Sequence, residues 1–375
     1  MTLSVAVNLT WVAPGRVGGS EQYLARQLLG LHEADADVDV TVACTRAFER
    51  VHTALGERFA IETAPVDRDN RALRIALEHT WLAARTRHAD VVHHGGGTAP
   101  LVGRRPIVLT IHDLQFRRFP EYFSAGRRRY LDAMMPRSVA RAAVVATPTE
   151  YVRSRVIEVF GADPERVVVV PHGVPPLSVQ GGDDVARARS ALGLGSRPFV
   201  LYPAITHPHK RHDLLVDMLD HLDDDTAVVL TGGAGRAELD LRERIARSAH
   251  VDRIVRPGRV DAADLDALIA GAEALVFPSE YEGFGAPLVE AMALGTPVVA
   301  SDAPAVREVV GDAGVIVEDG HGPDAAAAWA SAVDAARAGR AALVERGHRR
   351  RDAFTLRTSG TALDAAYRLA IRVES

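Results

Sequence analysis

The sequence predicts an α/β protein with two doubly wound, Rossmann-like domains, and three observations predict this class. Short valine-rich runs alternate with longer helical patterns along the whole chain. The runs are continuously apolar rather than alternating, which is typical of parallel strands covered on both faces. The pattern also breaks at a stretch rich in proline and glycine, residues 171–184, and then begins again. A chain of 375 residues exceeds what one core usually organises, so two domains are expected.

The expected strands follow in order. The first domain, residues 1–180, has the runs LSVAVNL, VDVTVAC, DVVH, PIVLTIHD, AVVATP and RVVVVPH. The second domain, residues 181–356, has FVLYPA, TAVVLTG, RIVRPG, ALVFPS, TPVVASD and GVIVED. The last segment, TSGTALDAAYRLAIRV, is an amphipathic helix with no strand after it, so it must dock on a core already built. Ligands bind beyond the carboxyl ends of such strands, and two facing domains create a cleft between those ends.

Composition excludes several classes of function. Hydrophobic residues make up 47% of the chain and charged residues 25%, and the net charge of −5 gives no electrostatic reason to expect a nucleic acid partner. A single cysteine, Cys44, excludes an internal disulfide and a zinc site built on several cysteines, which fits a reducing cytosol. The amino terminus lacks a basic region before its apolar stretch, and no run of about 18 apolar residues occurs. We therefore expect a cytoplasmic protein without a membrane span.

The strongest local pattern is ALVFPSEYEGFGAPLVEAMALGTPVVASD, residues 274–302. A buried strand leads into a glycine-containing loop, Pro287 suits the first turn of a helix, and Gly295 suits its end. Free N–H groups at the start of this helix predict a cradle for a diphosphate, contributed by Ala286, Leu288 and Val289. Glu290, one turn inside the helix, is placed to accept hydrogen bonds from a vicinal diol such as a ribose.

The segment EGFGAPLVEAMALGTPVVAS closely resembles the donor-binding signature of retaining glycosyltransferases of family 4, which have the GT-B fold. Other matching segments occur in the family's order: PGRVGGSEQYLARQLLGL, TIHDLQFRRFPEYFS, VVVVPHGV with His172 in an asparagine place, and YPAITHPHKRHDLL. The resemblance implies transfer of a hexose, with mannose as one candidate, from a GDP- or UDP-sugar to an acceptor hydroxyl with retained configuration. It also implies that no metal or cofactor is needed, and that residues of about 357–375 cross back to complete the first domain.

The family's site residues carry over by motif. The resemblance assigns catalytic roles to His112, Lys210 and Glu282. It assigns donor binding to Gly18, Gly19, Lys210, Arg211, Glu282, Gly283, Phe284, Gly285, Ala286, Pro287, Leu288 and Glu290. His94, Gly95 and Asp113 are candidates for the acceptor side, where a structural turn and a capping aspartate are the alternatives. The acceptor is expected to be a glycan, a lipid-linked sugar or a small molecule.

Lys210 is the only lysine beside 43 arginines, and its compact ammonium suits diphosphate oxygens in a way that a planar guanidinium does not reproduce. The sequence also departs from the family here. Many relatives have an arginine shortly before the lysine, whereas this chain has Ala204-Ile205-Thr206. Arg211 is the candidate for the second positive charge.

Several features have competing interpretations. We interpret the three aspartates at 223–225 as a solvated turn, namely Asp223, Asp224 and Asp225. The neighbouring histidines lack the pattern of a known metal site, so no metal is expected at His207, His209 and His212.

A basic region in the first domain has two interpretations. It forms either a solvated face or a region for a phosphorylated acceptor or for weak contact with the inner face of a membrane, and it comprises Arg117, Arg118, Arg127, Arg128 and Arg129. The alternatives to a transferase are a nucleotide-sugar epimerase and a degenerate sugar-nucleotide-binding protein.

Overall fold

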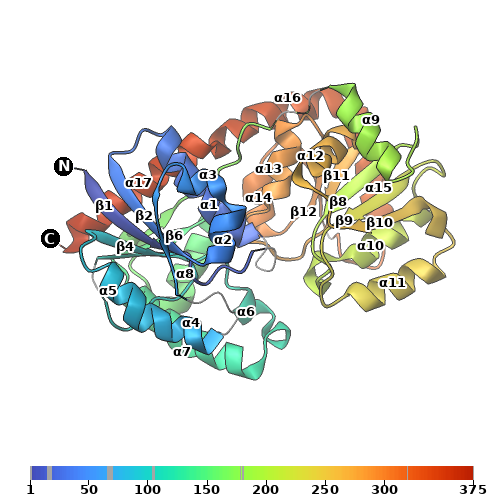
Figure 1. Cartoon of the computed structure of the whole chain (residues 1–375). Helices are drawn as coiled ribbons and strands as arrows, with labels where there is room; N and C mark the ends of the chain where they lie inside the picture. The colour runs from blue at the N-terminus through green and yellow to red at the C-terminus, as the bar shows by residue number, and fades with distance from the viewer. Residues whose placement is uncertain are drawn as a thin grey trace. The chain divides into compact units, whose positions relative to one another are not determined.

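The computed structural model describes residues 2–14, 19–65, 71–103, 106–177, 179, 181–318 and 320–374. The chain divides into two compact units. Unit 1 comprises Met1–Pro175 and Phe354–Ser375, and unit 2 comprises Pro176–Ala353. Each unit has its own parallel sheet with helices packed against it (Figure 1), which confirms the predicted fold class.

Unit 1 contains a seven-stranded sheet with the order β3-β2-β1-β4-β5-β6-β7, and every neighbouring pair is parallel. The strands are β1 Leu3–Asn8, β2 Val38–Cys44, β3 Ala60–Thr63, β4 Val91–His94, β5 Ile107–Thr110, β6 Val144–Thr147 and β7 Val167–Val169. The central strands β4, β5 and β6 are buried along their whole length, as their apolar runs predict. The edge strand β3 was not predicted, because its four residues are exposed or half-buried and carry no apolar run.

The helices of unit 1 include a carboxyl-terminal helix, α17 Leu356–Glu374, that packs along α1 Gly19–Glu33 (Figure 1). Gly30 and Gly360 let the two backbones touch, since a side chain at either position would collide with the other helix. The remaining helices are α2 Arg46–Val51, α3 Thr53–Gly56, α4 Arg71–Leu77, the π-helix η1 Glu78–Leu82, α5 Ala83–Arg85, α6 Gln115–Arg118, η2 Pro120–Tyr122, α7 Ala125–Arg141, α8 Glu150–Phe160 and η3 Pro164–Arg166.

Unit 2 contains a six-stranded parallel sheet with the order β10-β9-β8-β11-β12-β13. The strands are β8 Phe199–Pro203, β9 Ala227–Thr231, β10 Ile254–Gly258, β11 Ala274–Phe277, β12 Val298–Ser301 and β13 Gly314–Val317. The helices are α9 Gly182–Ala191, η4 Pro208–Lys210, α10 His212–Asp217, η5 Met218–Asp220, α11 Glu238–Arg247, η6 Val251–Arg253, α12 Ala262–Gly271, α13 Ala286–Ala293, α14 Pro304–Val310, α15 Ala325–Ala338 and α16 Arg340–Arg351. The turn η7 Asp352–Phe354 follows α16.

The strand order reverses direction at one point in each sheet, and this point locates the place where a ligand is expected. In unit 1 the chain moves outward from β1 to β2 and β3 and then returns to β4 on the other side of β1. In unit 2 the same reversal occurs between β8 and β11. Loops that leave the carboxyl ends of two such strands diverge to opposite faces of the sheet and open a crevice.

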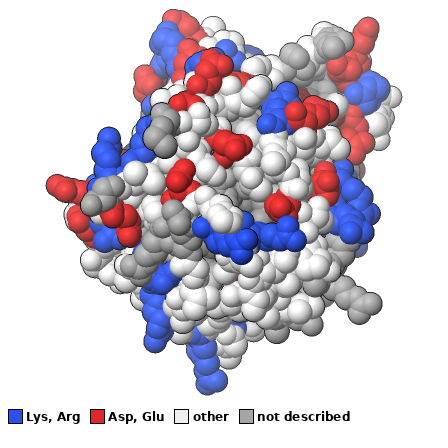
Figure 2. All heavy atoms as spheres, turned by 60° about the vertical axis from the view of Figure 1, so that its left-hand side comes forward, with Lys and Arg blue, Asp and Glu red and all other residues white. Residues whose placement is uncertain are grey.

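The described surface carries mixed charge. On the face drawn in Figure 2, acidic and basic side chains both lie among uncharged ones, and neither sign covers the face. Within the part of the chain that the structure describes, no helix combines the length and the apolar composition that crossing a membrane requires.

Candidate active site

The loops after β8 and β11 bring Lys210 and Glu282 together at the reversal point of the sheet in unit 2. Lys210 ends the short helix η4, and its Nζ atom donates a hydrogen bond to Oε1 of Glu282. Both side chains are largely shielded, with 19% and 14% of their surfaces exposed. The ammonium also lies 5.8 Å from the centre of the Phe277 ring, at a distance suited to a cation–π contact. The single lysine of the chain therefore has a defined position and a defined counter-ion.

Main-chain contacts connect these two loops. The N–H of Glu280 donates to the carbonyl of His209 at 2.8 Å, so the segment that leads to Glu282 is hydrogen-bonded to the segment that leads to Lys210. Arg211 adds side-chain contacts, because its Nη1 atom lies 2.8 Å from Oε1 of Glu280. The lysine and the glutamate are thus held by loops that contact each other.

The helix α13 begins directly after this loop, as the sequence predicts. Gly285 has φ +95°, a left-handed conformation that glycine adopts without strain, and Pro287 lies in the first turn. One expectation is wrong: the N–H of Leu288 is not free for a ligand, because it donates to the carbonyl of Gly285 at 3.0 Å. The left-handed Gly285 folds its carbonyl into the first turn, where it accepts the bond.

The other predicted donor-side residues surround this turn. Phe284 and Leu288 are buried, so the Phe284 ring is not presented to solvent. Gly283, Ala286, Pro287 and Glu290 are partly accessible. Glu290 lies in α13, one turn after the start of the helix.

Thr206 occupies the region where the resemblance leads one to expect an arginine. Its Oγ1 donates to Oε2 of Glu238 at 2.7 Å and accepts from the N–H of Gly235 at 2.7 Å. Arg256 donates to the same carboxylate oxygen at 2.9 Å. Burial alone would raise the pKa of Glu238, but hydrogen bonds from Arg256, Arg242 and Thr206 outweigh it and lower this pKa to about 2. This network is structural, and it fixes the loop that precedes Lys210.

In unit 1, His112 follows β5 and its Nε2 lies 2.8 Å from the carbonyl oxygen of Gly95. A carbonyl only accepts, so Nε2 carries the proton and Nδ1 of the neutral ring is a hydrogen-bond acceptor. Burial lowers the pKa of His112 to about 4, although the bond to Gly95 partly offsets this effect. The ring lies edge-on to Tyr23, with centres 5.1 Å apart. His112 is thus oriented and neutral near pH 7.

The predicted acceptor-side residues lie at the ends of the neighbouring strands. His94 ends β4, is buried, and contacts Nδ2 of Asn8 through its Nδ1 atom at 3.2 Å. Burial lowers the pKa of His94 to about 3, with smaller effects from Arg141 and His79. A side chain at Gly95 would approach within 2.6 Å of the end of the Leu24 side chain, so a larger residue there would require Leu24 to shift.

The remaining predicted residues of unit 1 are Asp113, Gly19 and Gly18. Asp113 accepts from the N–H of Gln115 at 2.8 Å, so the aspartate closes the turn that follows it. Gly19 is the first residue of α1, and a side chain there would meet nothing within 4 Å. Gly18 lies outside the described residues.

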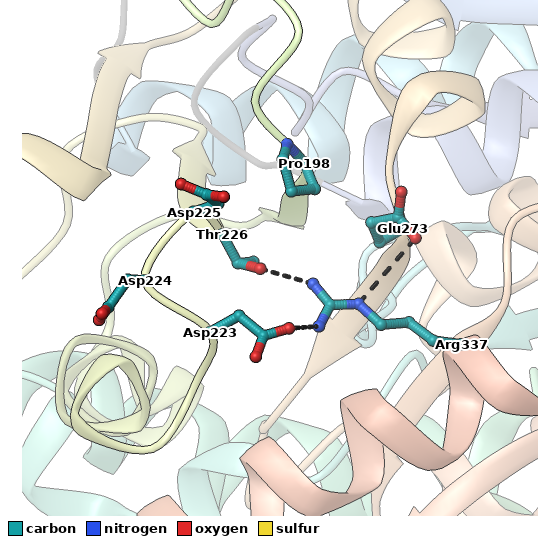
Figure 3. Close-up of a pocket in the computed structure, with 7 residues that line it drawn as sticks. All are labelled: Pro198, Asp223, Asp224, Asp225, Thr226, Glu273 and Arg337. Atoms are coloured by element: carbon teal, nitrogen blue, oxygen red, sulfur yellow. Dashed lines mark hydrogen bonds and ion pairs between the residues drawn. The ribbon is translucent and has the colours of Figure 1, made fainter.

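The aspartates at residues 223–225 and the histidines at 207, 209 and 212 were the clusters considered for metal binding. Asp223, Thr226 and Glu273 line a pocket of about 520 Å³ at the amino ends of the strands, opposite to the edge that carries Lys210. Figure 3 shows Arg337 extending into this pocket, with contacts of 3.2 Å to Asp223 and 2.6 Å to Thr226. Among the residues that the structure describes, no group of three or more His, Cys, Asp or Glu is arranged to hold a metal ion.

Two family models match the sequence in succession. Residues 17–176 match the model described as Glycosyltransferase Family 4, and residues 184–348 match the model described as Glycosyl transferases group 1. The chain belongs to the group 1 glycosyltransferases of family 4. It is therefore a glycosyltransferase enzyme.

Named relatives of this transferase include two mannosyltransferases and a glycosyltransferase of inositol phosphate. It is 28% identical over 236 residues to O-antigen chain mannosyltransferase B of Escherichia coli, a match that covers 62% of each chain. It is 26% identical to O-antigen chain mannosyltransferase RfbU of Salmonella typhimurium, and this match covers 84% of this chain and 86% of the relative. It is also 29% identical to D-inositol 3-phosphate glycosyltransferase of Salinispora tropica, over 93% of this chain and 80% of that protein.

Solved structures show the same GT-B fold as the transferase. HepE of Anabaena, in complex with UDP and glucose, has a TM-score of 0.76 at 21% identity and matches 96% of this chain and 98% of its own. WaaG, a glycosyltransferase involved in lipopolysaccharide biosynthesis, has a TM-score of 0.71 at 17% identity, over 96% and 98% of the two chains.

Sequence reasoning missed one residue that organises the predicted site of the transferase in unit 1. Tyr23 is fully buried, its hydroxyl donates to the carbonyl of Val170 at 2.5 Å, and its ring contacts both His112 and, at 4.2 Å between ring centres, His172. Its position on the buried face of α1, four residues after Gly19, was a usable signal. The residues that it contacts come from distant parts of the sequence, so its role was not evident.

Proposed function

We propose that the enzyme transfers a hexose from a nucleotide diphosphate sugar to an acceptor hydroxyl, with retention of configuration and without a metal ion. One observation carries this proposal: the only lysine of the chain pairs with Glu282 at the reversal point of the sheet in unit 2, beside the start of α13. Two other features fit a donor diphosphate at this place, namely the glycine-containing turn and the positive end of a helix.

In the proposed reaction, the bond between the anomeric carbon and the diphosphate oxygen breaks, and the acceptor oxygen bonds to that carbon on the same face. The acceptor proton passes to an oxygen of the departing diphosphate. Negative charge develops on this leaving group in the transition state, and its stabilisation is the main requirement for catalysis. Lys210 supplies a fixed positive charge that stabilises it. Because Lys210 provides this charge, no divalent cation is needed.

The hydroxyl groups of the donor require acceptors of hydrogen bonds. Glu282 is assigned to the transferred sugar, and Glu290 to the ribose diol. In unit 1, the unprotonated Nδ1 of His112 is assigned to a sugar hydroxyl, because the bond from Nε2 to Gly95 leaves Nδ1 as the accepting atom. Asp113, His94 and Gly95 are assigned to the acceptor side.

Mannose from GDP-mannose is the proposed donor group, and a UDP-sugar is the competing choice. The names of two relatives, both O-antigen chain mannosyltransferases, support mannose. One HepE structure contains UDP and glucose and another contains UDP-glucose, and both support a UDP-sugar. The proposed acceptor is a glycan or a lipid-linked sugar.

A lipid-linked acceptor fits the basic segment of residues 115–141. It contains seven arginines and two acidic residues, Glu121 and Asp132. Three of the arginines lie over aromatic rings: Arg117 over Phe116 at 5.2 Å, Arg118 over Phe119 at 5.1 Å and Arg127 over Phe123 at 4.9 Å. Exposed guanidinium groups beside aromatic rings suit weak peripheral contact with an anionic membrane surface.

The test is incubation with GDP-mannose and with UDP-glucose, with and without EDTA, followed by analysis of the anomeric products. Slow donor hydrolysis, or transfer with retained configuration, that is insensitive to EDTA supports the proposal. A 2-epimerised sugar would instead identify an epimerase, and nucleotide-sugar binding without turnover would identify a degenerate binding protein. Inversion of configuration, or turnover abolished by EDTA and restored by Mg²⁺, would contradict the proposed mechanism.

A further inference from the structure

Arg211, which directly follows Lys210, has an unusual backbone conformation. Its φ of +52° and ψ of 43° lie in the left-handed region. In the described part of the chain, Asp35 is the only other non-glycine residue with positive φ. A residue with a Cβ atom pays about 1–2 kcal/mol for this conformation, so surrounding contacts must hold Arg211 in place.

The side chain of Arg211 makes these contacts with three different segments. Nε and Nη2 donate to the carboxylate of Asp213 at 3.2 and 3.1 Å. Nη1 donates to Oε1 of Glu280 at 2.8 Å and lies 3.2 Å from Nδ1 of His321. The guanidinium thus contacts the first turn of α10, the loop after β11 and the segment after β13.

These contacts place two carboxylates around one guanidinium. Asp213 and Glu280 together carry more negative charge than Arg211 neutralises, so a phosphate approaching Arg211 would be repelled unless the carboxylates moved. The exposed fraction of the Arg211 side chain, 21%, is close to the 19% of Lys210, so the two cations differ in their charged neighbours rather than in their accessibility. The surroundings of Arg211 therefore differ from those of Lys210, which contacts the single carboxylate of Glu282 and the ring of Phe277.

Glu280 is the residue through which Arg211 contacts the loop that carries Glu282. Its side chain accepts from Arg211 and its own N–H donates to the carbonyl of His209, so the residue is fixed at two points to the loop that carries Lys210. Glu280 lies two positions before Glu282. These two contacts therefore tie the segment that carries Glu282 to the loop that carries Lys210.

We infer that Arg211 is a positioning residue, which acts through Glu280 to hold the loops of Lys210 and Glu282 together, and that it is not a ligand of the donor phosphates. This inference rests on the proposed function of Lys210 and Glu282. It replaces the expectation that Arg211 supplies a second positive charge to the diphosphate.

The two roles predict different combinations of kcat and nucleotide Kd for Arg211→Ala and Glu280→Gln. If Arg211 positions the loops, both Arg211→Ala and Glu280→Gln lower kcat by tenfold or more, leave the Kd of UDP or GDP within about twofold, and show no further loss when combined. If Arg211 binds phosphate, Arg211→Ala raises the Kd of the nucleoside diphosphate at least tenfold. Glu280→Gln then leaves this Kd unchanged or lowers it, because a competing carboxylate has been removed.

The experiment measures kcat, donor KM and nucleotide Kd by calorimetry for wild type, both variants and the double variant. Arg247→Ala is the matched control, since Arg247 forms an exposed pair with Glu243 at 3.0 Å in the same unit. Hydrogen exchange of the segment 279–286 provides a readout that does not need turnover. Faster exchange in both Arg211→Ala and Glu280→Gln is expected, with no change in Arg247→Ala.

The results separate the inference from the proposed function. If wild type turns over no nucleotide sugar, the proposed function fails, and the exchange data alone decide whether Arg211 holds the two loops. Unchanged exchange at 279–286 in both variants, or a selective loss of diphosphate affinity in Arg211→Ala, overturns the inference.

Discussion

Lys210 and Glu282 form an ion pair although 72 positions separate them in the sequence. The pair exists because β8 and β11 are neighbours in the sheet, so the loops that follow them meet at the same edge. Before a donor binds, Glu282 neutralises the ammonium of Lys210. A bound diphosphate would compete with this carboxylate for the same cation, which makes the pair a sensitive target for substitution.

Lys210→Arg is expected to retain the fold and to lower turnover at least tenfold, equivalent to about 1.4 kcal/mol of activation free energy. A planar guanidinium has different geometry and hydration from an ammonium, and the shielded space beside Glu282 and Phe277 is matched to the smaller group. Steady-state kinetics and circular dichroism measure the two effects. Near-normal turnover would show that any cation suffices at this position.

Glu282→Gln is expected to change donor binding and turnover in opposite directions. The substitution removes the carboxylate that competes for Lys210, so the Kd of UDP or GDP should fall by about threefold to tenfold. Turnover should fall because the glutamate assigned to the transferred sugar is lost. Calorimetry with the nucleotide and kinetics with the donor test the two parts. Weaker nucleotide binding in Glu282→Gln would contradict the competition between the carboxylate and the diphosphate.

The buried histidines of unit 1 are expected to make the protein less stable as the pH falls from about 6.5 towards 4. Burial lowers the pKa values of His93 and His94 to about 3, and that of His112 to about 4. Between these values and the unfolded pKa of about 6.5, the unfolded chain binds more protons than the folded one. The free energy of unfolding therefore decreases as the pH falls, by up to about 1.4 kcal/mol per pH unit for each histidine.

Denaturant titrations between pH 7.5 and 4.5 measure this slope. His93→Gln should make it shallower, whereas His88→Gln, at an exposed position, should leave it unchanged. A flat profile for wild type would show that these rings are protonated in the folded protein.

Glu238→Gln is expected to lower the free energy of unfolding at pH 7 by about 2 kcal/mol, because hydrogen bonds to a charged, shielded group are lost. The folded pKa of about 2 lies below the usual glutamate value of 4.5, so the carboxylate stabilises the fold above pH 4.5 and loses this effect as the pH falls towards 2. The difference between wild type and Glu238→Gln should therefore shrink in acid. Glu243→Gln, at an exposed pair, is the control and should change stability by less than about 0.5 kcal/mol.

Charge reversal in the basic segment tests the proposed membrane contact. Arg128→Glu combined with Arg129→Glu should reduce binding to vesicles that contain anionic lipid by about tenfold, because each basic residue contributes on the order of 1 kcal/mol near such a surface. Turnover with a water-soluble acceptor should stay unchanged, since neither side chain belongs to the assigned site. Equal binding of wild type to neutral and anionic vesicles would remove the basis for this contact.

The outline of the fold could be predicted from local sequence because buried parallel strands must be continuously apolar. This signal located β4, β5 and β6 and the strands of unit 2, and it failed at β3, whose exposed or half-buried residues carry no such run. The turn before α13 could also be predicted, since Gly285 and Pro287 have strong local preferences. The occupied N–H of Leu288 could not, because it depends on the dihedral angles of Gly285.

By itself, the sequence determined the alternation of strands and helices, the motif around Glu282 and Glu290, and the identity of the only lysine. Only the tertiary structure decided which side chain each of these residues meets. It placed Glu282 against Lys210, Glu280 and Asp213 around Arg211, and Tyr23 against His112. The physical reason is that strand order, rather than sequence distance, sets which loops meet at the carboxyl edge of a parallel sheet.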